Sequence, residues 1–427
     1  MDAPNSVPLE EGAIVGAVTE YYLKSRDFNG FPVRLVAGAD GDRHSLLTGL
    51  IERRVVSVNV GDRHPNPHIQ AFAPEPPEKQ IRSLAAASID HACLYPTKEH
   101  LAGVVDATSY AGQPYTLELA LGEPQIVCRF FELKVLEHYR NDPRYSYRTN
   151  DVQGSLSIRG EFYETGKVKE SDQILMQQFG FGYDEDVTTR VVAALLWDLS
   201  GLSDEHQQIW KANELSGRYL PHPDFWRAVL GHWPERISIF EAFIEELRQI
   251  NQMSRLMGRA PLFRKDFSGV DKPREFGFLI RPTLAEFNAF VQLLDKLLSD
   301  NIDPAFFGGD VLMETLEPRA DGALVVKPKG TISALSEWLD QKWQTPDPAP
   351  QVRMLKAFRT VRKLRSKPAH AIDENRFDQQ FFRDQRDLIL EAYEAIRNLR
   401  LMFANHPSVK GAHTVPDWLY KGDIWTR

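Results

Sequence analysis

An arginine and a histidine with four residues between them carry the most informative chemistry in this chain of 427 residues. They are Arg365 and His370, in the stretch "LRSKPAH". Histidine titrates near neutral pH and can transfer a proton. The planar guanidinium of arginine can stabilise charge on phosphate oxygens without a metal ion. These two tasks are what cleavage of RNA by its own 2′-hydroxyl requires.

The residues around this pair have the spacing of a helix. Residues 351–367 are helical in pattern, and the helix ends before Pro368 because proline disfavours helix in the preceding residue. A step of 100° per residue places four side chains on one stripe, which are Met354, Phe358, Val361 and Arg365. We expect Arg365 to pair with a carboxylate, line a cleft or lie at a subunit interface, since an unpaired buried charge is strongly unfavourable. The turn after the helix is expected to bring His370 close to Arg365.

The same helix is strongly basic and has no acidic residue between Val352 and Lys367. Such a run predicts a local phosphate-binding surface, although a solvated helix face is the usual explanation. The residues that we expect to bind RNA beside the catalytic pair are Arg359, Arg362, Lys363, Ser366 and Lys367. From spacing alone, an alternative remains open in which Arg365 caps helix carbonyls or pairs with an acid, and His370 is an exposed turn residue.

The stretch Arg365-Ser366-Lys367-Pro368-Ala369-His370 resembles the Arg-x4-6-His motif of the HEPN superfamily, whose motif precedes the last long helix of a small bundle. The resemblance covers about residues 282–407. It implies a metal-independent endoribonuclease, typically a homodimer with a composite cleft. Many members are toxins or phage-defence effectors, so an antitoxin or regulatory protein is a further partner implied. The family often adds an acidic residue from an earlier helix, for which Asp295, Glu337 and Asp340 are candidates.

The composition describes a globular chain, with 42% hydrophobic and 26% charged residues and a mean hydropathy of -0.37. No apolar run reaches membrane-spanning length and no secretory signal is visible, so we expect a cytoplasmic protein without a membrane partner. A formal charge of -8 argues against a globally basic nucleic-acid binder but leaves room for a local basic surface. We expect no cofactor. We also expect no metal, since two cysteines are too few for a four-ligand thiolate site.

The patterns indicate an α+β chain with four regions, at residues 1–75, 76–186, 187–281 and 282–427. The first resembles a winged helix, with helices at 13–23 and 44–54 and a two-stranded wing at 55–60 and 68–72. A small packing domain is the equally weighted alternative. The second region is a mixed, sheet-containing domain, with strands expected at 115–121, 126–133, 154–164 and 173–183. Its segment 138–148 interleaves arginines with tyrosines, which suits base stacking but more often packs on a sheet.

The last two regions are predicted to be helical. Capping boxes at Ser238/Glu241 and Thr283/Glu286 open two helices, and the amphipathic segments up to residue 407 predict an antiparallel helical bundle. The leading hypothesis is an RNA-cleaving effector whose bundle performs the cut. The alternative is a non-catalytic nucleic-acid-binding or regulatory scaffold with a dimerising bundle, because some HEPN domains are not nucleases.

Overall fold

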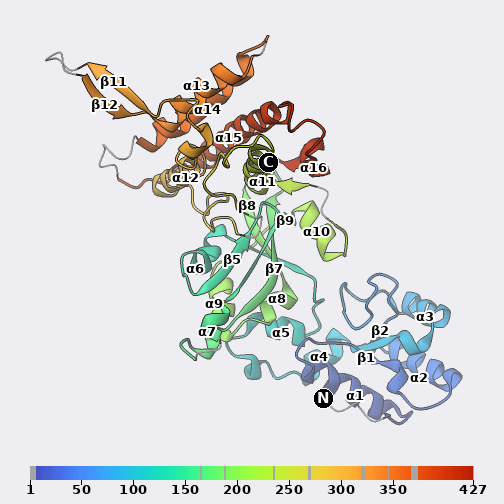
Figure 1. The fold of residues 1–427 in the computed structure, drawn as a ribbon. Coiled ribbons are helices and arrows are strands. Elements are labelled where there is room, and N and C mark those ends of the chain that lie inside the picture. Colours follow the sequence, from blue (N-terminus) through green and yellow to red (C-terminus); the bar gives the residue numbers. More distant parts are fainter. Residues whose placement is uncertain are drawn as a thin grey trace. The chain divides into compact units, whose positions relative to one another are not determined.

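The computed structural model describes residues 6–163, 166–186, 189–233, 236–267, 271–318, 324–344, 346–366 and 374–426. The chain divides into two compact units, one of Met1–Tyr147 with Gln153–Trp233 and one of Arg148–Val152 with Pro234–Arg427. Figure 1 shows sheets in the first unit and mainly helices in the second, so the α+β class with a helical C-terminal region is confirmed. Within the described ranges, no helix is both long enough and apolar enough to cross a membrane.

The N-terminal part of the first unit combines helices with a small antiparallel sheet in the order β1-β3-β2. Its elements are α1 (Glu11–Lys24), β1 (Phe31–Pro32), η1 (Val33–Leu35), α2 (Asp40–Glu52), β2 (Val56–Asn59), α3 (Pro77–Ala86), η2 (Ile89–His91), β3 (Cys93–Pro96), α4 (Lys98–Val104) and η3 (Ala107–Tyr110). The helices expected at 13–23 and 44–54 are confirmed as α1 and α2. Their apolar faces form a core with the sheet, in which Ile14, Leu47 and Leu94 are fully buried.

The expected two-stranded wing is wrong in its second strand. Residues 55–60 do contain strand β2, but residues 68–72 form no strand, and β2 pairs with β3, with Val58 opposite Leu94. The physical reason is a turn at Asn66, whose side chain accepts the backbone N–H of His68 at 3.0 Å. All four residues of β3 are buried. Burial in the centre of the sheet therefore stabilises β3 more than it would stabilise residues 68–72. The sheet thus takes a strand from beyond residue 75.

The rest of the first unit surrounds a larger antiparallel sheet in the order β4-β8-β7-β6-β5, with β9 paired to β7. Its elements are α5 (Pro114–Ala120), β4 (Cys128–Phe131), η4 (Leu133–Leu136), α6 (Glu137–Arg140), β5 (Tyr145–Thr149), β6 (Gln153–Ile158), α7 (Gly160–Tyr163), η5 (Glu170–Asp172), β7 (Leu175–Asp184), β8 (Arg190–Leu195), α8 (Leu196–Ser200), α9 (Asp204–Lys211), β9 (Tyr219–Pro221) and α10 (Pro223–Val229). The strands expected within 126–133 and 173–183 are confirmed as β4 and β7. The strand expected at 154–164 is confirmed for Gly154–Ile158, which belong to β6, and is wrong for Gly160–Tyr163, which form α7.

The strand expected at residues 115–121 is wrong, because this segment is helix α5. Pro114 occupies the start of the helix, where its fixed φ angle favours helix and its missing N–H is not needed. The buried residues Tyr115 and Leu119 are four positions apart, so they share one helical face. In so short a segment the apolar residues fit a period of two as well as a period of 3.6.

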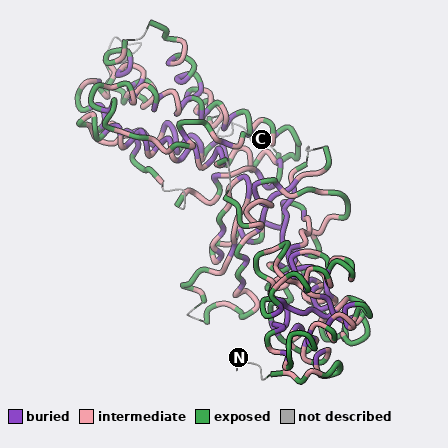
Figure 2. The backbone as a smooth tube through the Cα atoms, turned by 90° about the vertical axis from the view of Figure 1, so that its right-hand side faces the viewer, coloured by how far each residue is buried: buried purple, intermediate pink, exposed green. Residues whose placement is uncertain are grey.

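The second unit is a helical bundle with two small two-stranded sheets. Its elements are β10 (Ile237–Ser238), α11 (Ile239–Leu256), α12 (Leu284–Leu297), η6 (Pro304–Phe307), β11 (Glu314–Pro318), β12 (Leu324–Pro328), α13 (Thr331–Lys342), α14 (Ala349–Ser366), α15 (Gln380–Ala404), α16 (Asp417–Lys421) and β13 (Ile424–Trp425). Helix α15 packs on α11, α12 and α14, and α14 also packs on α12 and α13. Buried and exposed residues alternate along these helices in Figure 2, which is the pattern of amphipathic helices around one core.

Both expected capping residues begin helices where the sequence placed them. Ser238 accepts the backbone N–H of Phe240 at 3.2 Å, and Glu241 accepts the backbone N–H of Ser238, which completes the first box. Thr283 caps α12 by accepting the N–H of Glu286 at 3.3 Å. The Glu286 carboxylate reaches further back than expected and accepts the N–H of Ile280 at 3.0 Å. These caps fix where α11 and α12 start and therefore which faces they turn to the core.

Candidate functional site

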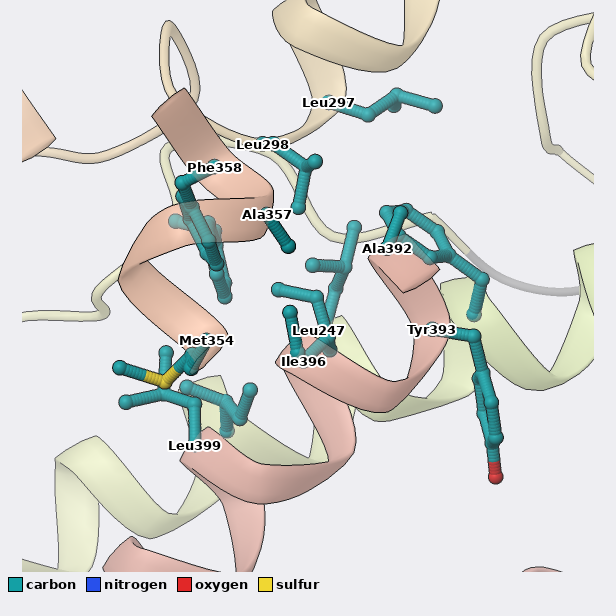
Figure 3. Packing of buried hydrophobic residues seen from close by; sticks show 14 of the residues in the cluster. Leu247, Leu297, Leu298, Met354, Ala357, Phe358, Ala392, Tyr393, Ile396 and Leu399 are labelled. Atoms are coloured by element: carbon teal, nitrogen blue, oxygen red, sulfur yellow. The ribbon is translucent and has the colours of Figure 1, made fainter. Parts of the chain in front are cut away.

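Helix α14 has two chemically opposite sides. Its buried side carries Met354, Phe358 and Val361, each at most 1% exposed, which pack among residues of α12 and α15. Figure 3 shows Met354 and Phe358 near Leu298, Ile396 and Leu399. Burial of such a side chain contributes roughly 1.5–3 kcal/mol, so the orientation of α14 about its axis is firmly set. The stripe predicted from the sequence is confirmed for these three residues.

The opposite side of α14 forms what we call the basic ridge, the exposed side chains of Arg353, Lys356, Arg359 and Lys363. Successive members are three or four residues apart, so they lie along one helix face. In the part of the chain that the structure describes, no carboxylate forms an ion pair with any of the four. Their charge is therefore available to a ligand, although the formal net charge of the chain is -8.

The C-terminal end of α14 carries a different arrangement, which we call the charge cluster and which consists of Arg362, Arg365, Asp295 and Asp300. Arg362 donates from Nε to Asp295 at 3.1 Å and from a terminal nitrogen to Asp300 at 2.7 Å. A single terminal nitrogen of Arg365 donates to Asp295 at 2.7 Å and to Asp300 at 2.6 Å. The cluster has two positive and two negative charges, and hydrogen bonding to Asp295 raises the pKa of Arg365 above its ordinary value.

The end of helix α12 positions both acids. Asp295 lies in the last turn of α12 and its side chain has no exposed surface, whereas the side chain of Asp300 is 36% exposed. The backbone N–H of Asp300 donates to the carbonyl of Asp295 at 3.1 Å, so the chain folds back after the helix and brings the two carboxylates together. Because Asp295 is fully buried, its charge depends on the two guanidinium groups for stabilisation.

The structure answers the question that the sequence raised about Arg365. Of the three expected environments, it has the first, a carboxylate partner, while 33% of its side chain is exposed. Of the three acids considered for the site, Asp295 is the one that contacts Arg365. Glu337 instead forms an ion pair with Lys329 at 2.5 Å, and Asp340 accepts a hydrogen bond from Gln351 at 2.7 Å.

The remaining site residues named from the sequence fall into four groups. Arg359 and Lys363 are on the basic ridge, as expected of phosphate-binding residues, whereas Arg362 is held in the charge cluster. Ser366 is exposed and donates from Oγ to the carbonyl of Arg362 at 3.0 Å. Lys367 and His370 lie outside the described residues.

Asp300 is the member of the charge cluster that the sequence did not single out. It stands three residues beyond the end of α12, so no helical period connects it to Asp295. The sequence did contain one indication of a second acid. Arg362 and Arg365 are three residues apart beside the buried stripe, and two guanidinium groups in that position need more than one carboxylate.

The segment 138–148 is not a stacking surface. Tyr139 and Tyr145 are fully buried and Tyr147 is 6% exposed, and the two former hydroxyls contact the buried ring of His206 at 2.8 Å and 3.3 Å. Arg144 is bound to Asp142 and to Asp172 at 2.7 Å and 2.9 Å. The tyrosines therefore pack on the sheet, which was the favoured interpretation of this segment. Nowhere in the described ranges do three or more His, Cys, Asp or Glu residues gather as metal ligands would.

Comparison of the chain with models of known families, with curated proteins and with solved structures gave no match.

Proposed function

We propose that the second unit binds RNA along α14 and cleaves it, as a metal-independent endoribonuclease of the HEPN type. The observation that carries the proposal is the basic ridge, four exposed cations without a described carboxylate partner, on the helix that carries Arg365. Free cations in a row attract a polyanion, because phosphate binding releases condensed counterions. The motif residue thus lies at one end of a surface suited to an RNA strand.

The geometry of Arg365 supports a role in binding a reacting phosphate. Both of its hydrogen bonds to acids use the same terminal nitrogen, and within the described part of the chain its Nε and other terminal nitrogen make none. Asp295 and Asp300 therefore hold the guanidinium by one corner, and the opposite edge has two parallel donors for phosphate oxygens. In the proposed reaction this edge stabilises the charge that develops on phosphorus oxygens, and His370 takes the proton of the 2′-hydroxyl.

The HEPN resemblance also leads us to propose a homodimer with a composite cleft, acting as a toxin or phage-defence effector under control of an antitoxin or regulatory protein. The first unit would then select the substrate or sense the trigger. Its α1, α2 and three-stranded sheet are the kinds of element found in a winged helix, with α3 inserted between β2 and β3.

A second candidate function is a non-catalytic RNA-binding scaffold with the same basic ridge. It is favoured by the charge cluster, because Arg365 already has two carboxylate partners and the cluster is neutral as a whole. In this function the only role of the charge cluster is to hold α14 against α12. The two candidates share the binding surface and differ only in the chemistry at Arg365 and His370.

Incubation of the full chain with mixed RNA in a chelator distinguishes the candidates. The nuclease proposal expects fragments to accumulate at a rate proportional to protein concentration, and at least about a hundredfold more slowly with His370→Ala. Intact RNA that is nevertheless retained by the protein would leave only the scaffold. Cleavage that stops in chelator would instead indicate a metal-dependent nuclease.

A further inference from the structure

A groove between α13 and α14 lies beside the basic ridge. Its volume is about 460 Å³, within the range of about 300–1,000 Å³ typical of sites for small molecules. Arg359 belongs to both features, because it lines the groove and is a member of the basic ridge. A strand whose phosphates follow the ridge therefore passes the mouth of this groove.

The residues that line the groove are of three chemical kinds. Leu355, 4% exposed, and the half-buried Trp343 supply apolar and aromatic surface. Asp340 supplies a carboxylate, which is oriented by the Nε2 of Gln351 at 2.7 Å. Arg359 supplies a positive charge at the side of the ridge. An aromatic ring, an oriented acceptor and a cation are the groups that bind an unstacked nucleobase and its phosphate.

We propose that this groove is a base subsite that receives one unstacked guanine of the RNA strand bound on the ridge. The proposal rests on RNA binding by the ridge, but not on cleavage. Asp340 is exposed, and an ionised carboxylate is only an acceptor. Guanine has two adjacent N–H donors on its Watson–Crick edge, whereas uracil has one N–H between two carbonyls that a carboxylate repels. The base stacks on Trp343, and Asp340 reads its edge.

The test measures how the full chain binds short single-stranded oligonucleotides with 2′-O-methyl sugars, which the proposed reaction cannot cleave. Three probes are compared by fluorescence anisotropy at fixed salt, namely oligouridine, oligouridine with one central guanine, and oligouridine with one central abasic site. We expect the guanine probe to bind about ten-fold more tightly than the abasic probe, because stacking of one base changes affinity by roughly 5- to 150-fold. Oligouridine should lie between the two.

Variants then locate the effect. Trp343→Leu should remove most of the difference between guanine and abasic probes, and Asp340→Asn should remove the preference for guanine over uridine. Both should still bind the abasic probe normally. Trp233→Leu is the matched control, because Trp233 is 89% exposed and belongs to the other unit, and it should change nothing. Circular dichroism confirms that each variant is folded.

The outcomes distinguish failure of the base subsite from failure of the proposed RNA binding. Equal binding of the three probes, or a guanine preference that survives both groove variants, overturns the subsite while RNA binding on the ridge stands. Failure of all probes to bind overturns the proposed function and the subsite together. A guanine preference lost in Trp343→Leu and Asp340→Asn but kept in Trp233→Leu supports the proposal.

Discussion

Replacement of Asp295 by asparagine removes the negative charge of the one fully buried acid in the charge cluster while it preserves the shape of the side chain. Asp295 accepts hydrogen bonds from Arg362 at 3.1 Å and Arg365 at 2.7 Å. Loss of one partner from a buried ion pair costs about 3–5 kcal/mol. The two arginine side chains are 37% and 33% exposed, so solvent screens part of their charge. We therefore expect Asp295→Asn to lower the free energy of unfolding by about 2–3 kcal/mol.

Asp300→Asn is the matched control, because Asp300 contacts the same two arginines but is 36% exposed. Its loss should cost at most about 1 kcal/mol, as for exposed ion pairs. Urea-induced unfolding followed by far-ultraviolet circular dichroism measures both, fitted with two transitions because the chain has two units. Our reasoning from burial would be refuted by a variant at 300 that is destabilised as much as the variant at 295.

Three further predictions follow from the structure. RNA affinity should fall roughly fifty-fold between about 50 and 200 mM salt if the four cations of the basic ridge each bind a phosphate, and reversal of Lys356, Arg359 and Lys363 to glutamate should abolish binding in a filter assay. His370→Ala should reduce cleavage by about a hundredfold or more while binding persists. Arg365→Lys should not retain full activity, because lysine lacks the planar edge of the guanidinium. Single-turnover rates measure both effects. Burial raises the pKa of Asp198 from 3.8 to about 7. The unfolded chain therefore loses this proton at a lower pH than the folded chain, and the free energy of unfolding should fall as pH rises from about 4 to about 7. Thermal melts should show a fall of roughly 2–4 kcal/mol relative to Asp198→Asn.

Local patterns in the sequence were sufficient for the helices of the bundle. The buried stripe from Met354 to Val361 and the caps at Ser238 and Thr283 depend on residues within a few positions of one another. A helix is specified by such neighbours, since its hydrogen bonds and its side-chain contacts are short in sequence. The exposed face of α14 could be predicted for the same reason.

Long-range pairing could not be predicted. The contact of Arg365 with Asp295 joins residues 70 positions apart, and only packing of α12 on α14 selects Asp295 from several acids. The partner of β2 lies at 93–96 instead of 68–72 for a similar reason, because strand pairing depends on which apolar segment reaches the sheet. The strand prediction for residues 115–121 was wrong because seven residues are too few to distinguish a period of two from a period of 3.6.

The chemical form of the RNA ends produced in chelator tests the central claim most directly. Attack by the 2′-hydroxyl leaves a 2′,3′-cyclic phosphate on one fragment and a free 5′-hydroxyl on the other, which mass spectrometry distinguishes from products of hydrolysis by water. We expect cyclic phosphates from RNA, at least about a hundredfold more slowly with His370→Ala, and no cleavage of DNA of the same sequence. Fragments with 5′-phosphate ends, or equal cleavage of DNA, would contradict the assignment of Arg365 and His370 as the catalytic pair.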